Sequence, residues 1–260
     1  MTKRIFALML AVFALLCTVT ACSPEDDVID DPVINIGTES LVYKDSQGDT
    51  FTYEYLSSTT VAITDFAGND EPHLVTIPAV IEERQVVAIA DGAFRAKSNI
   101  SDIKCEADVV SIGKHAFAYC EALKTVELPA SVETIDEGAF YNCSSLISCT
   151  LSEGLTTIGF YAFANCASLP TITFPKTLTS IGAFAFGDCV ALTAIIIPEG
   201  TVSVGAQAFY KCTAVKTLSL PASLTEIGDY AFNPVIRDLA DEDITVVDGS
   251  VAAEHISQFR

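Results

Sequence analysis

The feature that most constrains this chain is a sequence repeat with a fixed period of 23 residues. Its clearest mark is an Ala-Phe pair, whose phenylalanines are Phe94, Phe117, Phe140, Phe163, Phe186, Phe209 and Phe232. An Ile or Val precedes most pairs by five residues, and a Cys and then a Leu or Val follow most of them. A fixed period of this length predicts a solenoid, in which each unit buries its apolar residues only against its neighbours.

The unit around Phe117 shows two different spacings of apolar residues. Ile112, Ala116, Cys120 and Leu123 follow steps of four, four and three, which predicts the inward stripe of a short helix. In the next segment, residues 125–128, apolar and polar residues alternate, which predicts a short strand with Val126 and Leu128 inward. Because every coil runs in the same direction, successive strands are expected to pair in parallel.

The whole unit reads Leu-x-x-Val-x-Leu-Pro-x-x-Val-x-x-Ile-x-x-x-Ala-Phe-x-x-Cys and resembles the BspA-type leucine-rich repeats of surface proteins from oral and gut anaerobes. The resemblance covers roughly residues 75–234. It implies an α/β solenoid that is right-handed and curved, with short parallel strands on the concave face and short helices on the other side. It also implies a role in adhesion or binding rather than catalysis.

The first 40 residues are typical of an exported and anchored protein. Residues 1–21 begin with Lys3 and Arg4, continue with an apolar run and are interpreted as a signal peptide. They end in Val-Thr-Ala before Cys22, which resembles the lipobox of bacterial lipoproteins and predicts lipidation of Cys22; an ordinary secretory signal is the alternative. Residues 22–40 are acidic and contain prolines, so they predict a flexible tether. Its acidic start also resembles the surface-export signal of Bacteroidetes lipoproteins, so an outer-membrane, cell-surface location is expected.

The remaining chain divides into three parts. Residues 41–85 alternate with period two and predict β-hairpins that cap the first coil, since an open solenoid end exposes unpaired backbone. A small hairpin is expected at residues 82–85. Residues 86–234 hold the repeats, and residues 235–260 predict a second cap with a last strand near 244–247 and a terminal helix. Acids in the loop 65–72 suit either turns or calcium.

Five cysteines occupy one column, one per coil: Cys120, Cys143, Cys166, Cys189 and Cys212. Side chains in a parallel column point the same way rather than at each other, which favours reduced core residues over disulfides. A straight column does not converge on a metal, so no metal site is expected.

Composition and motifs exclude several classes of function. A formal net charge of −20 repels nucleic acid and anionic lipid surfaces, so contact with the membrane is expected through the lipid anchor alone. His73, His115 and His255 lie far apart in the sequence, and no nucleophile motif or phosphate-binding loop occurs. We therefore expect neither an enzyme nor a cofactor.

The candidate sites are consequently surfaces. The outward positions of the predicted strands are rich in hydroxyl groups and predict one binding face, formed by Thr125, Glu127, Ser148, Thr150, Thr171, Thr173, Ile196, Thr217 and Ser219. Thr also suits strands for its β-propensity alone, so a solvated sheet is the alternative. An aromatic column with Tyr161 and Phe184 is the competing face, unless packing between coils accounts for it.

These observations favour a lipid-anchored, non-enzymatic surface protein that binds a protein or glycan macromolecule of a host or another microbe. The alternative is capture of a glycan or peptide for an outer-membrane transporter.

Overall fold

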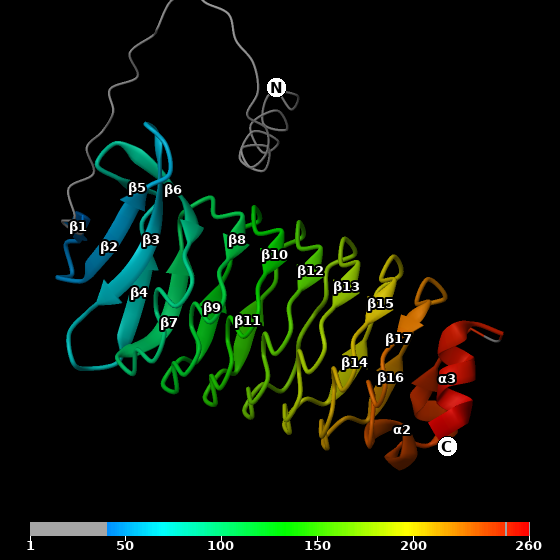
Figure 1. Cartoon of the computed structure of the whole chain (residues 1–260). Helices are drawn as coiled ribbons and strands as arrows, with labels where there is room; N and C mark the ends of the chain where they lie inside the picture. The colour runs from blue at the N-terminus through cyan, green and yellow to red at the C-terminus, as the bar shows by residue number, and fades with distance from the viewer. Residues whose placement is uncertain (1–40, 248, 260) are drawn as a thin grey trace, which may run out of the picture. The chain divides into compact units, whose positions relative to one another are not determined.

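The structure, a computed structural model, describes residues 41–247 and 249–259 (Figure 1). The expected signal peptide (1–21), the tether (22–40) and the lipidation site Cys22 lie outside the described residues. In the part of the chain that is described, no helix has the length and apolar character needed to cross a membrane.

The elements follow one another along the chain as short strands, with helical segments only at the end. The strands are β1 (Leu41–Lys44), β2 (Thr50–Tyr55), β3 (Thr60–Ala67), β4 (His73–Ile77), β5 (Val80–Ile81), β6 (Arg84–Ile89), β7 (Ile100–Cys105), β8 (Ser111–Ile112), β9 (Thr125–Glu127), β10 (Thr134–Ile135), β11 (Ser148–Thr150), β12 (Thr157–Ile158), β13 (Ser180–Ile181), β14 (Ala194–Ile196), β15 (Ser203–Val204), β16 (Thr217–Ser219), β17 (Glu226–Ile227) and β18 (Ile244–Thr245). The helical segments are α2 (Val235–Asp238), the 3-10 helix η1 (Asp241–Asp243) and α3 (Val251–Phe259).

Each full repeat forms one coil, and most coils contribute a strand to each of two rows, as β9 and β10 show (Figure 1). β9 pairs in parallel with β11, and Val126 lies opposite Cys149. β10 pairs in parallel with β12, and Ile135 lies opposite Ile158. Each residue therefore meets its own equivalent one repeat later. The predicted parallel pairing of successive coils is confirmed.

The strands form three sheets. The long sheet has eleven strands in the order β1-β2-β3-β6-β8-β10-β12-β13-β15-β17, with β5 paired to β6. The other row consists of a four-stranded sheet, β11-β9-β7-β4, and a three-stranded sheet, β14-β16-β18.

The short helices predicted around the Ala-Phe pairs are wrong, because these segments form turns. The backbone N–H of Phe117 donates to the carbonyl oxygen of Ala139 in the next coil at 2.7 Å, not to a residue four positions earlier. His115 and Tyr119 have φ angles of +53° and +63°, a left-handed conformation through which an α-helix does not continue. The fold is therefore a β-solenoid with few helices.

The Ile column belongs to the long sheet rather than to a helix. Ile112 lies in β8 and Ile135 in β10, and both side chains are fully buried. The residue before each of them faces outward and is half-buried.

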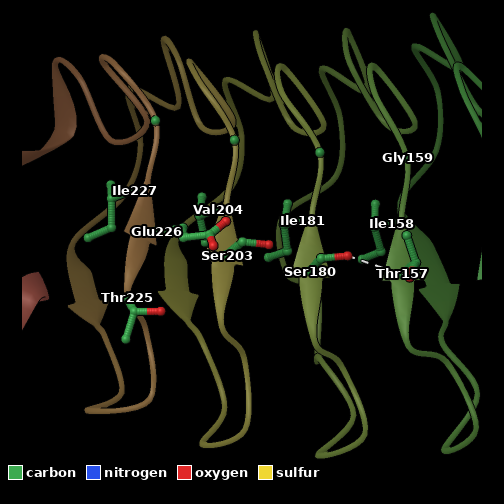
Figure 2. A pocket seen from close by; sticks show the side chains of 13 residues that line it. Thr157, Ile158, Gly159, Ser180, Ile181, Ser203, Val204, Thr225, Glu226 and Ile227 are labelled. Atoms are coloured by element: carbon green, nitrogen blue, oxygen red, sulfur yellow. Dashed lines mark hydrogen bonds between the residues drawn. The ribbon is translucent and has the colours of Figure 1, made fainter.

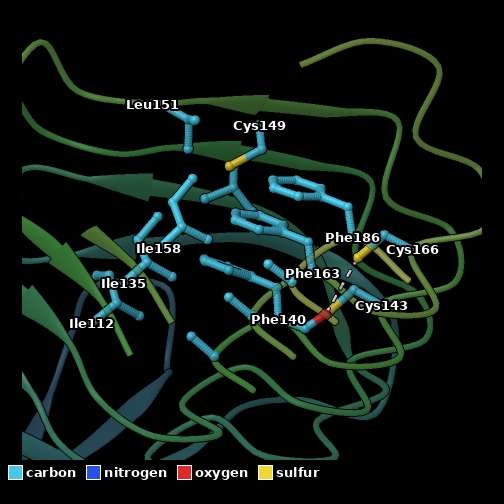
Figure 3. Packing of buried hydrophobic residues seen from close by; sticks show 14 of the residues in the cluster. Ile112, Ile135, Phe140, Cys143, Cys149, Leu151, Ile158, Phe163, Cys166 and Phe186 are labelled. Carbon is cyan, nitrogen blue, oxygen red and sulfur yellow. Dashed lines mark hydrogen bonds between the residues drawn. The ribbon is translucent and has the colours of Figure 1, made fainter. Parts of the chain in front are cut away.

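Stacked phenylalanine rings fill the centre of the solenoid, and all seven Ala-Phe phenylalanines are 0 % exposed. The rings of Phe117 and Phe140 have centroids 5.2 Å apart and an interplanar angle of 3°. Phe163 continues the stack at 5.0 Å from Phe140 and 5.2 Å from Phe186 (Figure 3). Burial of these rings away from water is a main source of the stability of the coils.

The cysteine column lies beside this stack, as predicted, and all five side chains are buried free thiols. Each sulfur donates a hydrogen bond to the carbonyl oxygen of the phenylalanine in the preceding coil. The Sγ–O distances are 3.0 Å for Cys120 to Phe94, 3.1 Å for Cys143 to Phe117, 3.3 Å for Cys166 to Phe140, 3.1 Å for Cys189 to Phe163 and 3.2 Å for Cys212 to Phe186. The column thus links neighbouring coils as well as filling space.

The predicted hairpins at the start of the described chain are present. β1 and β2 pair antiparallel, β2 and β3 pair antiparallel, and β3 lies parallel to β6. β5 and β6 form the small hairpin expected at residues 82–85, and its turn residues Glu82 and Glu83 have positive φ. β4 pairs in parallel with β7, so the second row of strands begins at residue 73, inside the range assigned to the hairpins.

The chain ends as the sequence predicts, with a last strand and a helix. β18 pairs in parallel with β16 and places Ile244 opposite Leu218. α3 buries Ala252 and Ile256 against the end of the core.

Candidate binding surfaces

The predicted binding residues lie on the outward side of the row formed by β4, β7, β9, β11, β14 and β16. We call this surface, including residues 171–173, the strand face. Its exposed members are Glu127, Ser148, Thr150, Thr171, Thr173, Ile196 and Thr217, while Thr125 and Ser219 are half-buried. Those in β9, β11, β14 and β16 point outward because every second residue of a strand does so, and Val126 and Cys149 between them are buried.

The register adds residues that sequence reasoning missed. Leu74 of β4 lies opposite Asp102, and Thr76 lies opposite Lys104, so both continue the outward columns. Thr245 of β18 lies opposite Ser219 and extends the face at its other end. The alternation in residues 73–77 was the available signal, but it lies before the first Ala-Phe pair.

Some polar groups of the strand face are already used within the protein. The hydroxyl groups of Ser101 and Thr125 both donate to the carboxylate of Asp102. The ammonium group of Lys104 lies 2.7 Å from the carboxylate of Glu106. Asp102 is thereby held in place, and Thr125 has less capacity for a ligand than Ser148 or Thr150.

A proline interrupts the strand face. Lys124, Ile147, Thr193 and Lys216 each donate their backbone N–H to the preceding coil, and Pro170 occupies the equivalent position without an N–H. Residues 171–175 are not in a strand, and the row is split there into two sheets. The prediction that Thr171 and Thr173 lie on a strand of this face is therefore wrong.

Tyr161 and Phe184 of the aromatic column belong to a longer chain of ring contacts across five coils. The ring centroids are 5.3 Å apart for Tyr119–Tyr141, 6.0 Å for Tyr141–Tyr161, 5.0 Å for Tyr161–Phe184 and 6.2 Å for Phe184–Tyr210. Tyr161 and Phe184 are half-buried and pack on each other, so contact between coils accounts for much of their surface. The more exposed aromatic side chains, at 39–54 %, are those of Tyr119, Phe160 and Tyr230.

A third surface, on the outward side of the long sheet, was not predicted. A shallow groove of about 670 Å³ runs over β12, β13, β15 and β17 (Figure 2). Thr157, Ser180, Ser203 and Glu226 line it, together with the glycines that follow each strand. The signal is a Ser or Thr directly before the Ile or Val in five successive units, but the spacing of that Ile or Val predicts the start of a helix.

The other residues that could carry chemistry are the three histidines and the acidic loop 65–72. The three histidines lie in different parts: His73 contacts Asp49, His115 lies beside Gly138, and His255 lies near Phe232. Within the described ranges, no three His, Cys, Asp or Glu side chains gather where they could hold a metal ion. In the loop 65–72, Asp65 pairs with Lys97 at 2.8 Å and the carbonyl oxygen of Asn69 accepts from Asn99 at 2.6 Å, so this loop is held by protein contacts.

The buried thiols are not reactive nucleophiles. Burial raises the pKa of Cys120 and Cys189 to about 12, because a thiolate would lose its hydration. Burial also raises the pKa values of Cys143, Cys166 and Cys212 well above the usual value for a thiol. Nucleophilic catalysis requires a lowered thiol pKa, which is the opposite condition.

Comparison with known families agrees with this geometry. The family model described as "BspA type Leucine rich repeat region" matches six copies in the chain, over residues 75–189 and 145–240. The chain belongs to the BspA-type leucine-rich repeat family. The family assignment thus covers the solenoid, from β4 to the segment after α2.

Several solved structures resemble this BspA-type chain. A leucine-rich repeat protein of T. pallidum is 24 % identical, with a TM-score of 0.66, over 80 % of this chain and 92 % of that one. A leucine-rich repeat protein from Bacteroides capillosus is 30 % identical over 45 % of this chain and 86 % of its own, with a TM-score of 0.38. A leucine rich cell surface protein from Faecalibacterium prausnitzii is 22 % identical over 73 % of each chain, with a TM-score of 0.39. Among curated proteins, none matches the chain.

Proposed function

We propose that this BspA-type protein binds a protein or glycan macromolecule through the strand face and catalyses no reaction. The observation that carries the proposal is the in-register pairing of β9 with β11 and of β14 with β16, which holds small outward side chains at fixed spacing. Strands about 4.8 Å apart need little further ordering when a partner binds, so less of the binding energy is lost.

The composition of the strand face favours an extended partner. Ser148, Thr150 and Thr217 are short and exposed, so a polypeptide or glycan chain has close access to the sheet. Glu127 and Asp102 make one end of the strand face more favourable for cationic groups of a partner. The break at Pro170 divides the face into two segments, and we propose the segment of β7, β9 and β11 as the main contact.

A binding screen of the chain without its signal peptide and lipidation site tests this function. Residues 23–260 are immobilised and exposed to matrix proteins, peptides and a glycan array. The variant Ser148→Lys with Thr150→Lys should lose the ligand, because two long cations would cover the face. A matched control, Thr157→Lys with Ser203→Lys, places the same substitutions on the groove of the long sheet and should retain binding. Tyr161→Ala with Phe184→Ala tests the aromatic column, and loss in that variant alone would refute the strand face.

We also propose that the protein is anchored at the cell surface, in the outer membrane, by lipid attached to Cys22. The support is the Val-Thr-Ala-Cys sequence after an apolar leader, followed by an acidic segment. Cys22→Ser should release the protein from membrane fractions or leave the unprocessed precursor. If the variant were processed and stayed in the membrane, lipid attachment would be the wrong mechanism.

The repeat family supports two finer features as proposals. One is a right-handed curvature with the strand face on its concave side. The other is a capping role for β1–β3, which cover the first coil and replace an exposed sheet edge by hairpins. Deletion of residues 41–67 should then produce aggregation rather than a shorter soluble solenoid.

A further inference from the structure

His73 lies between two hydrogen-bond acceptors. Its Nε2 is 2.9 Å from each carboxylate oxygen of Asp49, and its Nδ1 is 2.9 Å from the carbonyl oxygen of Glu71. A carboxylate and a carbonyl group accept but do not donate, so both ring nitrogens must donate to satisfy both contacts. A neutral imidazole has only one N–H, so with Asp49 ionised both contacts are satisfied by the doubly protonated, cationic ring.

Asp49 needs this cation because its side chain is only 1 % exposed. It closes the turn between β1 and β2, where its backbone N–H donates to the carboxylate of Asp45 at 2.9 Å. A carboxylate removed from water is strongly unfavourable unless it is paired and hydrogen-bonded. The His73 side chain, 19 % exposed, is the charged partner at the rim of the site.

The two residues belong to different sheets. Asp49 lies at the β1–β2 turn, at the end of the long sheet, whereas His73 is the first residue of β4. β4 is the terminal strand of the order β11-β9-β7-β4, so β7 is its one neighbour in that sheet. The pair consequently connects the hairpins with the first strand of the strand face.

We propose that Asp49 and His73 form a proton-dependent latch, which holds the β1–β2 turn against β4 and loosens when the imidazole loses a proton. The proposal does not depend on the identity of any ligand. It gives the protein a response to pH in the physiological range.

The charges around the ring support the closed state. From the β1–β2 turn, Asp45 and Asp49 face the ring, and the loop before β4 carries Asp70 and Glu71. Asp65, which lies in β3 before this loop, is paired with Lys97. Burial lowers the pKa of His73, but the hydrogen bonds to Glu71 and Asp49 and the charges of Asp49 and Asp45 outweigh it and raise the pKa above its usual value.

The sign of the pH effect follows from this direction. Because the pKa of His73 is raised in the folded state, the latch contributes its full stability below the unfolded value of about 6.5. This stability is lost as the pH rises through the folded-state pKa. The folded protein should therefore lose thermal stability between mildly acidic and mildly alkaline pH.

The test uses the mature chain in two measurements. NMR titration of the His73 ring should give a midpoint above pH 6.5, and amide exchange in residues 73–77 should rise beyond the intrinsic pH effect when the ring deprotonates. Thermal unfolding is then compared from pH 5.5 to 9 with His73→Gln, whose amide donates without titrating. Over this range the wild type should lose more degrees of Tm than the variant.

His115→Gln is the matched control, because Gln207 occupies the equivalent repeat position with a φ of +56°, close to the +53° of His115. This control should keep the pH dependence of the wild type. A His73 ring that is neutral at pH 6, or an equal pH dependence in His73→Gln and wild type, would overturn the proposal. If His73→Gln does not fold, the NMR titration of the wild type still decides.

Discussion

The sulfur of Cys143 donates a hydrogen bond of 3.1 Å to the carbonyl oxygen of Phe117, one coil earlier. The same carbonyl oxygen accepts the backbone N–H of Cys120 at 3.2 Å. The thiol therefore supplements a bond inside one coil with a bond between coils. This arrangement repeats at every column cysteine and explains why a small residue with a weak donor suits the position.

Cys143→Ala should destabilise the protein by about 1–2 kcal/mol, through loss of this hydrogen bond and of sulfur packing in the core. The cost stays moderate because the Phe117 carbonyl keeps its bond from Cys120. Chemical denaturation measures the change, and Cys143→Ser, which keeps a donor, is the matched control. If Cys143→Ala has the same denaturation midpoint as the wild type, the thiol contact does not contribute to stability.

The buried thiols also predict sensitivity to alkali. Their pKa values are raised in the folded state, to about 12 for Cys149 and Cys189, mainly by burial. Stability from the neutral thiols is therefore complete below the unfolded thiol pKa of about 8.5 and falls as the pH rises above it. Between its unfolded and folded pKa values, each thiol should lower the free energy of unfolding by up to about 1.4 kcal/mol per pH unit. Thermal unfolding from pH 8 to 11 should show a shallower decline for Cys189→Ala than for the wild type.

The solenoid was predictable because the 23-residue period puts the residues of each apolar column at the same position in every coil. Phe163, Cys166 and Val126 are buried as the columns predicted. The turns around the Ala-Phe pairs were not predictable from spacing alone, since steps of four, four and three fit both a helix and a series of consecutive turns. A second signal did exist: Asn142, Asn165 and Asp188 occupy one repeat position, and Asn and Asp adopt positive φ more readily than other residues.

The candidate surfaces were predictable only where strand alternation decides them. Thr150 and Thr217 face outward because their neighbours Cys149 and Leu218 face the core. The groove beside Ser180 does not follow from the sequence, because the spacing of Ile181 predicts a helix rather than a strand there. The Asp49–His73 contact joins residues 24 positions apart across two sheets, and no local pattern marks it.

Phe163→Ala should cost about 3–5 kcal/mol, because it removes a fully buried ring from the middle of the stack and leaves a cavity. The rings of Phe140 and Phe186 lose a stacking partner on one side each. Urea denaturation gives the free energy of unfolding. Phe160→Ala is the control. Phe160 lies in the same coil as Phe163 but is 41 % exposed, so its replacement should change the free energy of unfolding far less.

Pro170→Thr tests why the strand face is divided. Thr193 occupies the equivalent position and donates its backbone N–H to the carbonyl oxygen of Pro170 at 3.0 Å. A threonine at 170 has the N–H needed to reach Ile147 and join the two sheets. The gain of about 0.5–1.5 kcal/mol from a hydrogen bond is offset by about 0.4–1 kcal/mol, because the unfolded chain becomes more flexible without proline. Net stability should thus change by less than about 1 kcal/mol.

Amide exchange at Thr171 and Thr173 reports the outcome more directly, since both amides should become protected when strands form there. Pro198→Ser is the matched control, because Ser152 occupies its repeat position in another unit. The control should leave exchange at residues 171–173 unchanged. Equal exchange in Pro170→Thr and wild type would show that the missing donor is not what divides the face. The division of the strand face would then be attributed to the width of the coil at Phe174. The ring centroid of Phe174 lies 5.5 Å from that of Phe186.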